Sequence, residues 1–395
     1  DDYLAKAAAS LNMKGIDQTT IRLTNAAIKI RPDAEGYFLR AYAKSNMNDH
    51  IGAILDLDKV IEINPNDIDA FYNRGNSKMA LGDFKGAISD FSLSIKNDPK
   101  DFDSYYNMGI SKFNLGDLEG SIKANNNAIK IKEDFWEAYI NLGVSKKQLE
   151  DYKGAIADLK KAIKINPESA IDGAFFNLGQ IYNLQNNYKE AIKKYNKAIK
   201  LNPSDSEYYF NRGIVNQNLY RKKAAINDYD KAIKLNPYDP KYYYNRGIAK
   251  RQTNDPRGAI FDYNRLLELD NKYPELDKVY NNRGNARIDI GDFKAAIDDY
   301  KKAIIINPEF ALGYYNLGII QAKIGKLNLG INSLNAAIKI SPKDSYIYID
   351  RALLKDKIGD TSGYCSDLIK ASELGAEEIT RYLNNSGSWC MEISN

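Results

Sequence analysis

The 395-residue chain has little of the chemistry that most enzymes and metal sites use. It contains one histidine, His50, and two cysteines, Cys365 and Cys390. Histidine is the side chain that titrates near neutral pH, and His and Cys are the usual zinc ligands. No Gly-x4-Gly-Lys-Ser/Thr or Gly-x-Gly-x2-Gly phosphate-binding loop occurs in the sequence. We therefore expect no catalytic site, no metal and no cofactor.

A dominant charge and a long apolar run are also missing. The 56 basic and 52 acidic residues give a net charge of +4 and are interleaved along the chain. This balance gives no electrostatic reason to expect a nucleic-acid partner. No stretch reaches the roughly 20 apolar residues of a transmembrane helix, so no membrane span is expected. The carboxylates are expected on exposed helix faces, without acid–base pairs.

The chain does have a clear internal repeat, which is the first feature to seek in a long sequence. Residues 64–99 and 202–237 share the same order of features: Asn-Pro, an aromatic pair, Asn-x-Gly, an Ala-Ile pair and a closing Pro. The glycine of Asn-x-Gly recurs at a nearly constant interval and serves below as the reference position. The reference residues are Ala8, Ala41, Gly75, Gly109, Gly143, Gly179, Gly213, Gly247, Gly284, Gly318 and Ala352.

Each repeat is predicted to form two helices. In residues 191–203 the apolar residues recur at helical spacing, Gly82 suits the turn between helices, and Pro99 ends the second helix. The repeats, numbered 1 to 11 below, cover 1–32, 33–65, 66–99, 100–133, 134–167, 168–203, 204–237, 238–271, 272–308, 309–342 and 343–376.

The small and large positions resemble the tetratricopeptide repeat over residues 1–376. They include the reference glycine, two alanines of the second helix such as Ala191 and Ala198, and an aromatic residue such as Tyr195 between them. The Tyr-Asn-Arg-Gly sequences are similar to bacterial, particularly cyanobacterial, members. The resemblance implies an all-α fold: a right-handed α-α superhelical solenoid of about eleven helix-turn-helix repeats. First helices would then line a concave groove.

Two columns of residues are candidates for binding in that groove. Asparagine lies two residues before the reference position at Asn73, Asn107, Asn141, Asn177, Asn211, Asn245, Asn282 and Asn316. Aromatic residues lie three before it, including Tyr72, Tyr106, Phe176, Phe210, Tyr244 and Tyr315. Amides could hold the backbone of an extended peptide, and aromatics could add apolar contact. The alternatives are that the asparagines only bond neighbouring repeats, or that the columns serve self-association.

The charge six residues before the reference position changes along the chain. Acidic residues occupy this place in earlier repeats, and basic residues follow: Glu35, Asp69, Asp103, Glu137 and Glu207, then Lys241 and Lys278. Acids suit the first turn of a helix in any case. The change of sign otherwise predicts a polarised ligand or head-to-tail complementarity.

The C-terminal residues 377–395 depart from the repeat and are predicted to form a capping helix, over 377–385, and a tail. Cys365 and Cys390 could form a disulfide, which would imply an oxidising compartment; two thiols are equally consistent with the sequence. The first residue, Asp1, is not Met. Together these features favour an exported protein slightly over a cytoplasmic one.

These observations predict a non-catalytic scaffold that binds a partner protein or extended peptide in the concave groove. The alternative is a structural subunit that self-associates through its end repeats or edges into an oligomer or filament, because stacked repeats with weak caps can continue from one chain to the next.

Overall fold

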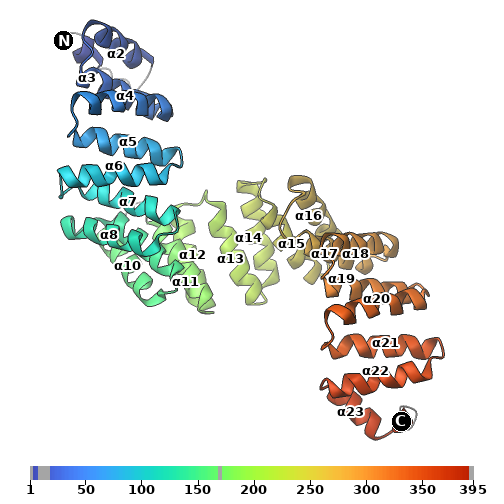
Figure 1. The fold of residues 1–395 in the computed structure, drawn as a ribbon. Coiled ribbons are helices and arrows are strands. Elements are labelled where there is room, and N and C mark those ends of the chain that lie inside the picture. Colours follow the sequence, from blue (N-terminus) through green and yellow to red (C-terminus); the bar gives the residue numbers. More distant parts are fainter. Residues whose placement is uncertain (1–2, 8–17, 168–170, 391–395) are drawn as a thin grey trace. The chain divides into compact units, whose positions relative to one another are not determined.

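The computed structural model describes residues 3–7, 18–167 and 171–390, and these are helical throughout, without a β-strand (Figure 1). The predicted reference residue Ala8 and the tail residues 391–395 lie outside the described residues. The prediction of an all-α fold built from repeated helix pairs is confirmed. The helices are α2 (Gln18–Ile30), α3 (Ala34–Asn46), α4 (His50–Ile63), α5 (Ile68–Ala80), α6 (Phe84–Asn97), α7 (Phe102–Asn114), α8 (Leu118–Ile131), α9 (Trp136–Gln148), α10 (Tyr152–Ile165), α11 (Asp172–Leu184), α12 (Tyr188–Leu201), α13 (Ser206–Asn218), α14 (Lys222–Leu235), α15 (Pro240–Gln252), α16 (Pro256–Leu269), α17 (Leu276–Asp289), α18 (Phe293–Ile306), α19 (Ala311–Lys323), α20 (Leu327–Ile340), α21 (Ser345–Lys357), α22 (Thr361–Glu373) and α23 (Glu377–Asn384).

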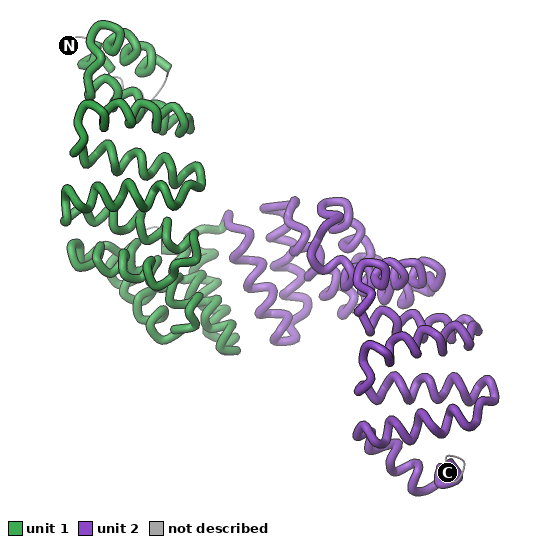
Figure 2. The backbone as a smooth tube through the Cα atoms, in the orientation of Figure 1, with its two compact units in different colours: residues 1–203 green, residues 204–395 purple. Residues whose placement is uncertain are grey.

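The chain forms two compact units, residues 1–203 and 204–395 (Figure 2). Within each unit, the first helix of a repeat packs against the second helix of the same repeat, and that second helix packs against the first helix of the next. From α3 onward, first helices carry odd numbers and second helices even numbers. No helix of the described residues is both long and apolar enough to cross a membrane.

Short polar and glycine residues set the helix ends. Most first and second helices begin after an aspartate whose carboxylate accepts a backbone N–H of the first turn, as Asp83 does from Gly86. The turn between the two helices of a repeat places a residue in the left-handed region, for example Gly82 at φ 79°. Asn48, Glu150 and Asn186 take the same conformation in repeats without glycine there. The turn position therefore requires a left-handed backbone conformation, which glycine adopts most readily and other residues adopt in some repeats.

The reference glycine allows the two helices of a repeat to approach closely. A Cβ atom on Gly179 would lie 2.5 Å from Cε1 of Tyr195, and one on Gly247 would lie 2.8 Å from Cε1 of Tyr263. Both tyrosines are fully buried. The large ring of the second helix thus fills the space that the small residue of the first helix leaves, as close packing of interiors requires.

The C-terminal end of the second unit is covered by α23, one residue shorter than the predicted span 377–385. Cys365 on α22 and Cys390 after α23 form a disulfide with an Sγ–Sγ distance of 2.00 Å. Both sulfur-bearing residues are buried in a cluster with Leu368 and Leu383. The tail segment up to Cys390 is thereby tied to the last repeat.

Candidate protein-binding surface

First helices of successive repeats lie beside one another within each compact unit. Successive first helices contact one another directly, through α3, α5, α7, α9 and α11 in the first unit, and through α13, α15 and α17, then α19 and α21, in the second. Successive second helices of the described residues make no comparable contact. The first helices therefore lie on the inner side of each stack, and we call their exposed surface the inner row.

Half of the predicted asparagines bond to their own helix. In each of these, Nδ2 donates to the backbone carbonyl four residues earlier at 2.8–2.9 Å. Such a bond fixes the side-chain rotamer and occupies one donor of the amide. The four residues are Asn73, Asn177, Asn211 and Asn245.

Three others bond to the preceding repeat. Nδ2 of Asn107 donates to Oδ1 of Asn76 at 2.9 Å and to the hydroxyl of Tyr72 at 3.3 Å. Asn282 and Asn316 donate across the same interface, to the Tyr244 hydroxyl at 3.3 Å and to Oδ1 of Asn281 at 2.8 Å. The two predicted columns are therefore brought together, with aromatic hydroxyls accepting from amides of the next repeat.

Asn141 differs from the other seven asparagines. Its Nδ2 is buried and has no hydrogen-bond partner among the described residues. Its side chain lines a cavity of about 80 Å³ with Ile110, Phe113 and Val144. A buried donor without a hydrogen bond costs free energy. Asn141 carries this cost, whereas Nδ2 of each of the other seven asparagines donates within the protein.

The aromatic column is at least half-buried against the second helices. Tyr72 packs on Phe91 with ring centroids 6.1 Å apart, and Phe210 packs on Tyr229 at 5.9 Å. Burial is the main cause that raises the pKa of Tyr244 to about 12, so its hydroxyl stays protonated at neutral pH. The rings of this column offer one edge to the inner row while the rest of each ring stabilises its own repeat. Tyr106, Phe176 and Tyr315 are also half-buried. Phe176 packs on Tyr195 of its own second helix at 5.9 Å, whereas Tyr106 packs on Phe135, just before α9 of the next repeat, at 4.9 Å.

The predicted basic part of the inner row is neutralised locally. Nζ of Lys241 lies 2.8 Å from Oε1 of Glu207 and 3.1 Å from Oδ2 of Asp239, and Lys278 pairs with Glu275. The Lys241 and Lys278 ammonium groups are therefore not unpaired cations that attract a ligand.

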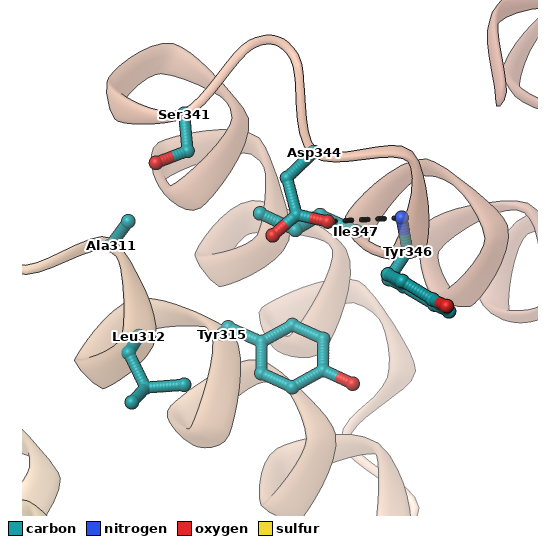
Figure 3. A pocket seen from close by; sticks show the side chains of 7 residues that line it. All are labelled: Ala311, Leu312, Tyr315, Ser341, Asp344, Tyr346 and Ile347. Atoms are coloured by element: carbon teal, nitrogen blue, oxygen red, sulfur yellow. Dashed lines mark hydrogen bonds between the residues drawn. The ribbon is translucent and has the colours of Figure 1, made fainter. Parts of the chain in front are cut away.

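In the next two repeats the same place is apolar. Leu312 and Tyr346 stand six residues before their reference positions and are 49% and 74% exposed. They line a pocket of about 320 Å³ between the first turns of α19 and α21 (Figure 3). The other lining residues are Ala311, Tyr315, Ser341, Asp344 and Ile347.

The pocket walls are held by hydrogen bonds. Oδ1 of Asp344 accepts the backbone N–H of Tyr346 at 3.1 Å (Figure 3). The hydroxyl of Tyr315 donates to Oδ2 of Asp350 at 2.7 Å. Burial, then this hydrogen bond, raises the pKa of Tyr315. The pocket thus combines fixed apolar walls with one carboxylate at its edge.

The repeat pattern and these helix pairs agree with comparisons with known families. Models described as "TPR repeat" and "Tetratricopeptide repeat" match more than half of the chain. The matched residues are 34–67, 68–101, 102–135, 136–169, 179–219, 206–239, 240–273, 284–325 and 311–344.

The chain belongs to the tetratricopeptide repeat family.

Solved tetratricopeptide-type structures are similar to parts of the chain. MamA is 26% identical over 40% of this chain and 92% of its own, with a TM-score of 0.38. A tetratricopeptide repeat protein from Parabacteroides merdae is 21% identical over 63% and 97%, with a TM-score of 0.48. PilF of Pseudomonas aeruginosa is 18% identical over 56% and 97%, with a TM-score of 0.49. A search of curated proteins found no match.

Membership sets the general kind of function. Tetratricopeptide repeat proteins are typically scaffolds for protein interactions and typically not enzymes. Solenoid repeats create extended surfaces that bind partners along several units at once. The described residues contain no group of three His, Cys, Asp or Glu side chains placed to hold a metal ion.

The expectation that carboxylates lie on exposed faces was wrong for one position of these tetratricopeptide repeats. An aspartate in the middle of the second helix is buried in several repeats and pairs with the arginine just before the reference position. In repeat 8, Arg246 donates to both carboxylate oxygens of Asp262 at 2.9 and 2.6 Å, and Lys250 lies 3.0 Å away. The pairs are Arg40–Asp56, Arg74–Asp90, Arg212–Asp228, Arg246–Asp262, Arg283–Asp299 and Arg351–Asp367.

An available sequence signal would have identified these pairs. Wherever a described repeat has arginine before the reference position, it has aspartate at the same fixed spacing after that arginine. Repeats 4, 6 and 10 have Met108, Leu178 and Leu317 instead and lack the aspartate. The arginines also stack over the aromatic residue three positions before them, as Arg246 does over Tyr243 at 5.6 Å. These residues hold the two helices of a repeat together and so position the inner row.

Proposed function

We propose that this chain is a non-catalytic scaffold that binds an extended segment of a partner protein along its inner row. The pocket between α19 and α21 holds a bulky apolar side chain of that segment. One observation carries the proposal: Leu312 and Tyr346 are large apolar side chains exposed at a place where most earlier repeats carry charge.

The composition and size of the pocket support this ligand. A volume of about 320 Å³ is at the lower end of the range for small-ligand pockets, which begins near roughly 300 Å³. Aromatic and aliphatic side chains that enter such pockets supply much of the affinity of protein interfaces. Asp344 at the edge favours a basic side chain or backbone N–H beside the apolar residue.

The asparagine column supports an extended conformation of the bound segment. The residues proposed to face it are Asn73, Asn107, Asn141, Asn177, Asn211, Asn245, Asn282 and Asn316, with Tyr72, Tyr106, Phe176, Phe210, Tyr244 and Tyr315 beside them. Since several Nδ2 groups already donate within the protein, the amide oxygens are the groups that would accept backbone N–H bonds from a partner.

We also infer that the Cys365–Cys390 disulfide forms in the protein in solution and closes the C-terminal end of the stack. A 25-residue separation makes it a link that restricts the unfolded chain. Alkylation of the denatured, non-reduced protein followed by intact-mass measurement tests this, because denaturation exposes both buried cysteines. No label is expected without reductant, and two labels under denaturing, non-reducing conditions would contradict it.

The proposed function is tested by selecting random twelve-residue peptides against the full chain. Binding of the selected peptides is then measured with the double variant Leu312→Lys and Tyr346→Glu, which installs the residues found at this place in repeats 9 and 7. Ile305→Lys is the control, because Ile305 is 77% exposed on the second helix α18 and other repeats carry lysine there.

The proposal predicts that selected peptides carry a bulky apolar residue, bind the control like the wild type and lose most affinity for the double variant. Equal binding to all three proteins would overturn the assignment of the pocket. Regular multimers that grow with concentration, without peptide binding, would instead favour the self-associating subunit.

A further inference from the structure

Lys147 is a partly buried cation of the first compact unit, without a carboxylate partner among the described residues. It lies near the C-terminus of α9, on the inner row. Its Nζ donates to Oδ1 of Asn177 at 2.7 Å and to Oε1 of Gln180 at 2.6 Å, both on α11. Burial alone lowers the pKa of Lys147, and no described carboxylate lies within ion-pair distance. Two neutral oxygens therefore fix an ammonium group that still has a third donor.

The equivalent position in the second compact unit has the carboxylate partner that Lys147 lacks. Arg251 stands four residues after its reference glycine, as Lys147 does, and these are the two cations at this place in the chain. Nε of Arg251 lies 2.6 Å from Oδ2 of Asp289 on the next first helix. The residue of repeat 6 that corresponds to Asp289 of repeat 9 is Leu184, which is 57% exposed. A carboxylate from the adjacent repeat thus neutralises one cation but not the other.

We propose that Lys147, held by Asn177 and Gln180, binds a carboxylate of the partner's extended segment. This inference rests on the proposed function, because it requires a partner on the inner row. The Arg251–Asp289 pair shows that a carboxylate fits at this place in the repeat. A single ammonium flanked by neutral amides suits a monoanion, whereas a phosphate group has more acceptor oxygens than this site has donors.

The amides also select against neutral ligands. With Asn177 and Gln180 oxygens already accepting, the ammonium is positioned before the ligand arrives, so little side-chain entropy is lost on binding. An amide ligand would offer only a neutral acceptor and would leave the charge without a counter-ion, which is unfavourable for a partly buried cation. The site should therefore distinguish glutamate from glutamine.

The test uses full-length protein with ¹⁵N-labelled lysine and follows the ammonium signal of Lys147, assigned by its loss in Lys147→Met. The probes are a blocked alanine pentapeptide with one central glutamate, the same peptide with glutamine, and an all-alanine peptide with an unblocked C-terminus. Leu184→Asp places the carboxylate of repeat 9 beside Lys147, and Leu184→Asn is its uncharged control.

We expect the glutamate peptide to shift the Lys147 signal and the glutamine peptide not to. Binding measured from this signal should be about tenfold weaker in Leu184→Asp and unchanged in Leu184→Asn. A response to the unblocked alanine peptide instead of the glutamate peptide would identify a chain terminus as the carboxylate source.

The inference is overturned if Leu184→Asp binds the glutamate peptide like the wild type, or if no carboxylate peptide shifts the signal at millimolar concentration. Loss of this site with intact binding of apolar peptides to the α19–α21 pocket would leave the proposed function standing. Loss of peptide binding to the α19–α21 pocket with an intact Lys147 response would overturn the pocket assignment and leave the Lys147 site standing.

Discussion

Repeats 5 and 8 have the same helix lengths but handle their charges differently. Their first helices, α9 and α15, have 13 residues, and their second helices, α10 and α16, have 14. In repeat 8, Arg246 and Lys250 share the fully buried Asp262, and Arg251 pairs with a carboxylate of the next repeat. Each of these cations therefore has a carboxylate partner within the protein.

Repeat 5 leaves its charges less satisfied. Leu142 replaces the arginine, so Asp158 has Lys146 at 2.6 Å as its ion-pair partner, and burial raises the pKa of Asp158. Lys147 has no carboxylate at all among the described residues. The comparison teaches that small-to-large packing fixes the shape of a repeat, while the charges can vary without changing that shape. Charges left unpaired are then available to a ligand.

The largest predicted difference between the two repeats concerns their aspartates. Asp262→Ala leaves Lys250 without a counter-ion and Arg246 with only the half-exposed Asp230, and should lower the free energy of unfolding by about 3–5 kcal/mol. Asp158→Ala should cost clearly less, because Leu142 carries no charge and Lys146 can turn toward solvent. Urea denaturation of both variants measures this, and equal losses would contradict the comparison.

The reference glycines should behave alike in both repeats, because packing is the feature that they share. A Cβ on Gly143 would lie 2.6 Å from Cγ of Leu159, and one on Gly247 would lie 2.8 Å from Cε1 of Tyr263. Gly143→Ala and Gly247→Ala should each cost about 1–3 kcal/mol through overpacking. Thermal melts of the two variants provide the check, and a neutral substitution at either site would show that the approach of the helices is not tight.

Leu142→Arg should convert repeat 5 to the arrangement of repeat 8. The new arginine can reach Asp158 as Arg246 reaches Asp262, and its charged hydrogen bonds are worth about 1.5–3 kcal/mol. The lost burial of leucine costs about 2 kcal/mol, so unfolding free energy should change by less than roughly 1 kcal/mol. Denaturation should show a folded protein of near-normal stability; failure to fold would indicate that the repeat geometry depends on the leucine.

The smallest expected effect is a pH dependence that comes from Asp158 of repeat 5. Since the folded-state pKa of Asp158 is raised above the ordinary 3.8, the folded protein binds this proton more tightly than the unfolded chain does. The contribution of Asp158 to the stability of the folded protein is therefore fully present below pH 3.8 and is lost as pH rises through the folded-state pKa of Asp158. Asp158→Asn should gain stability relative to wild type as pH rises above that value; a gain on acidification would reverse the assignment.

Much of the fold could be predicted from spacing alone, because each repeat restates the same small and large positions. Gly179 and Tyr195 lie on the two helices of one repeat, and the equivalent contact recurs at the same spacing in each matching repeat. The Arg246–Asp262 contact has equally regular spacing, yet buried charges are unusual enough that a solvent-exposed face is the natural first interpretation.

The candidate site was less predictable for a physical reason. Both the state of Lys147 and the pocket at Leu312 and Tyr346 depend on residues in neighbouring repeats, which are distant in sequence. Leu184 in place of an aspartate decides whether Lys147 has a counter-ion, and no local pattern around Lys147 carries that information. The internal bonds of the asparagines likewise depend on which acceptor the preceding repeat presents.

The most direct test of the account is to map where a selected peptide lies on the protein. A peptide whose bulky apolar residue carries a photoreactive diazirine is cross-linked to the full chain, and the modified residues are located by mass spectrometry. The account predicts labels on α19 and α21 around Leu312 and Tyr346, with unlabelled competitor abolishing them. Competable labels confined to the second helices α18, α20 and α22 would contradict the claim that partners bind the inner row.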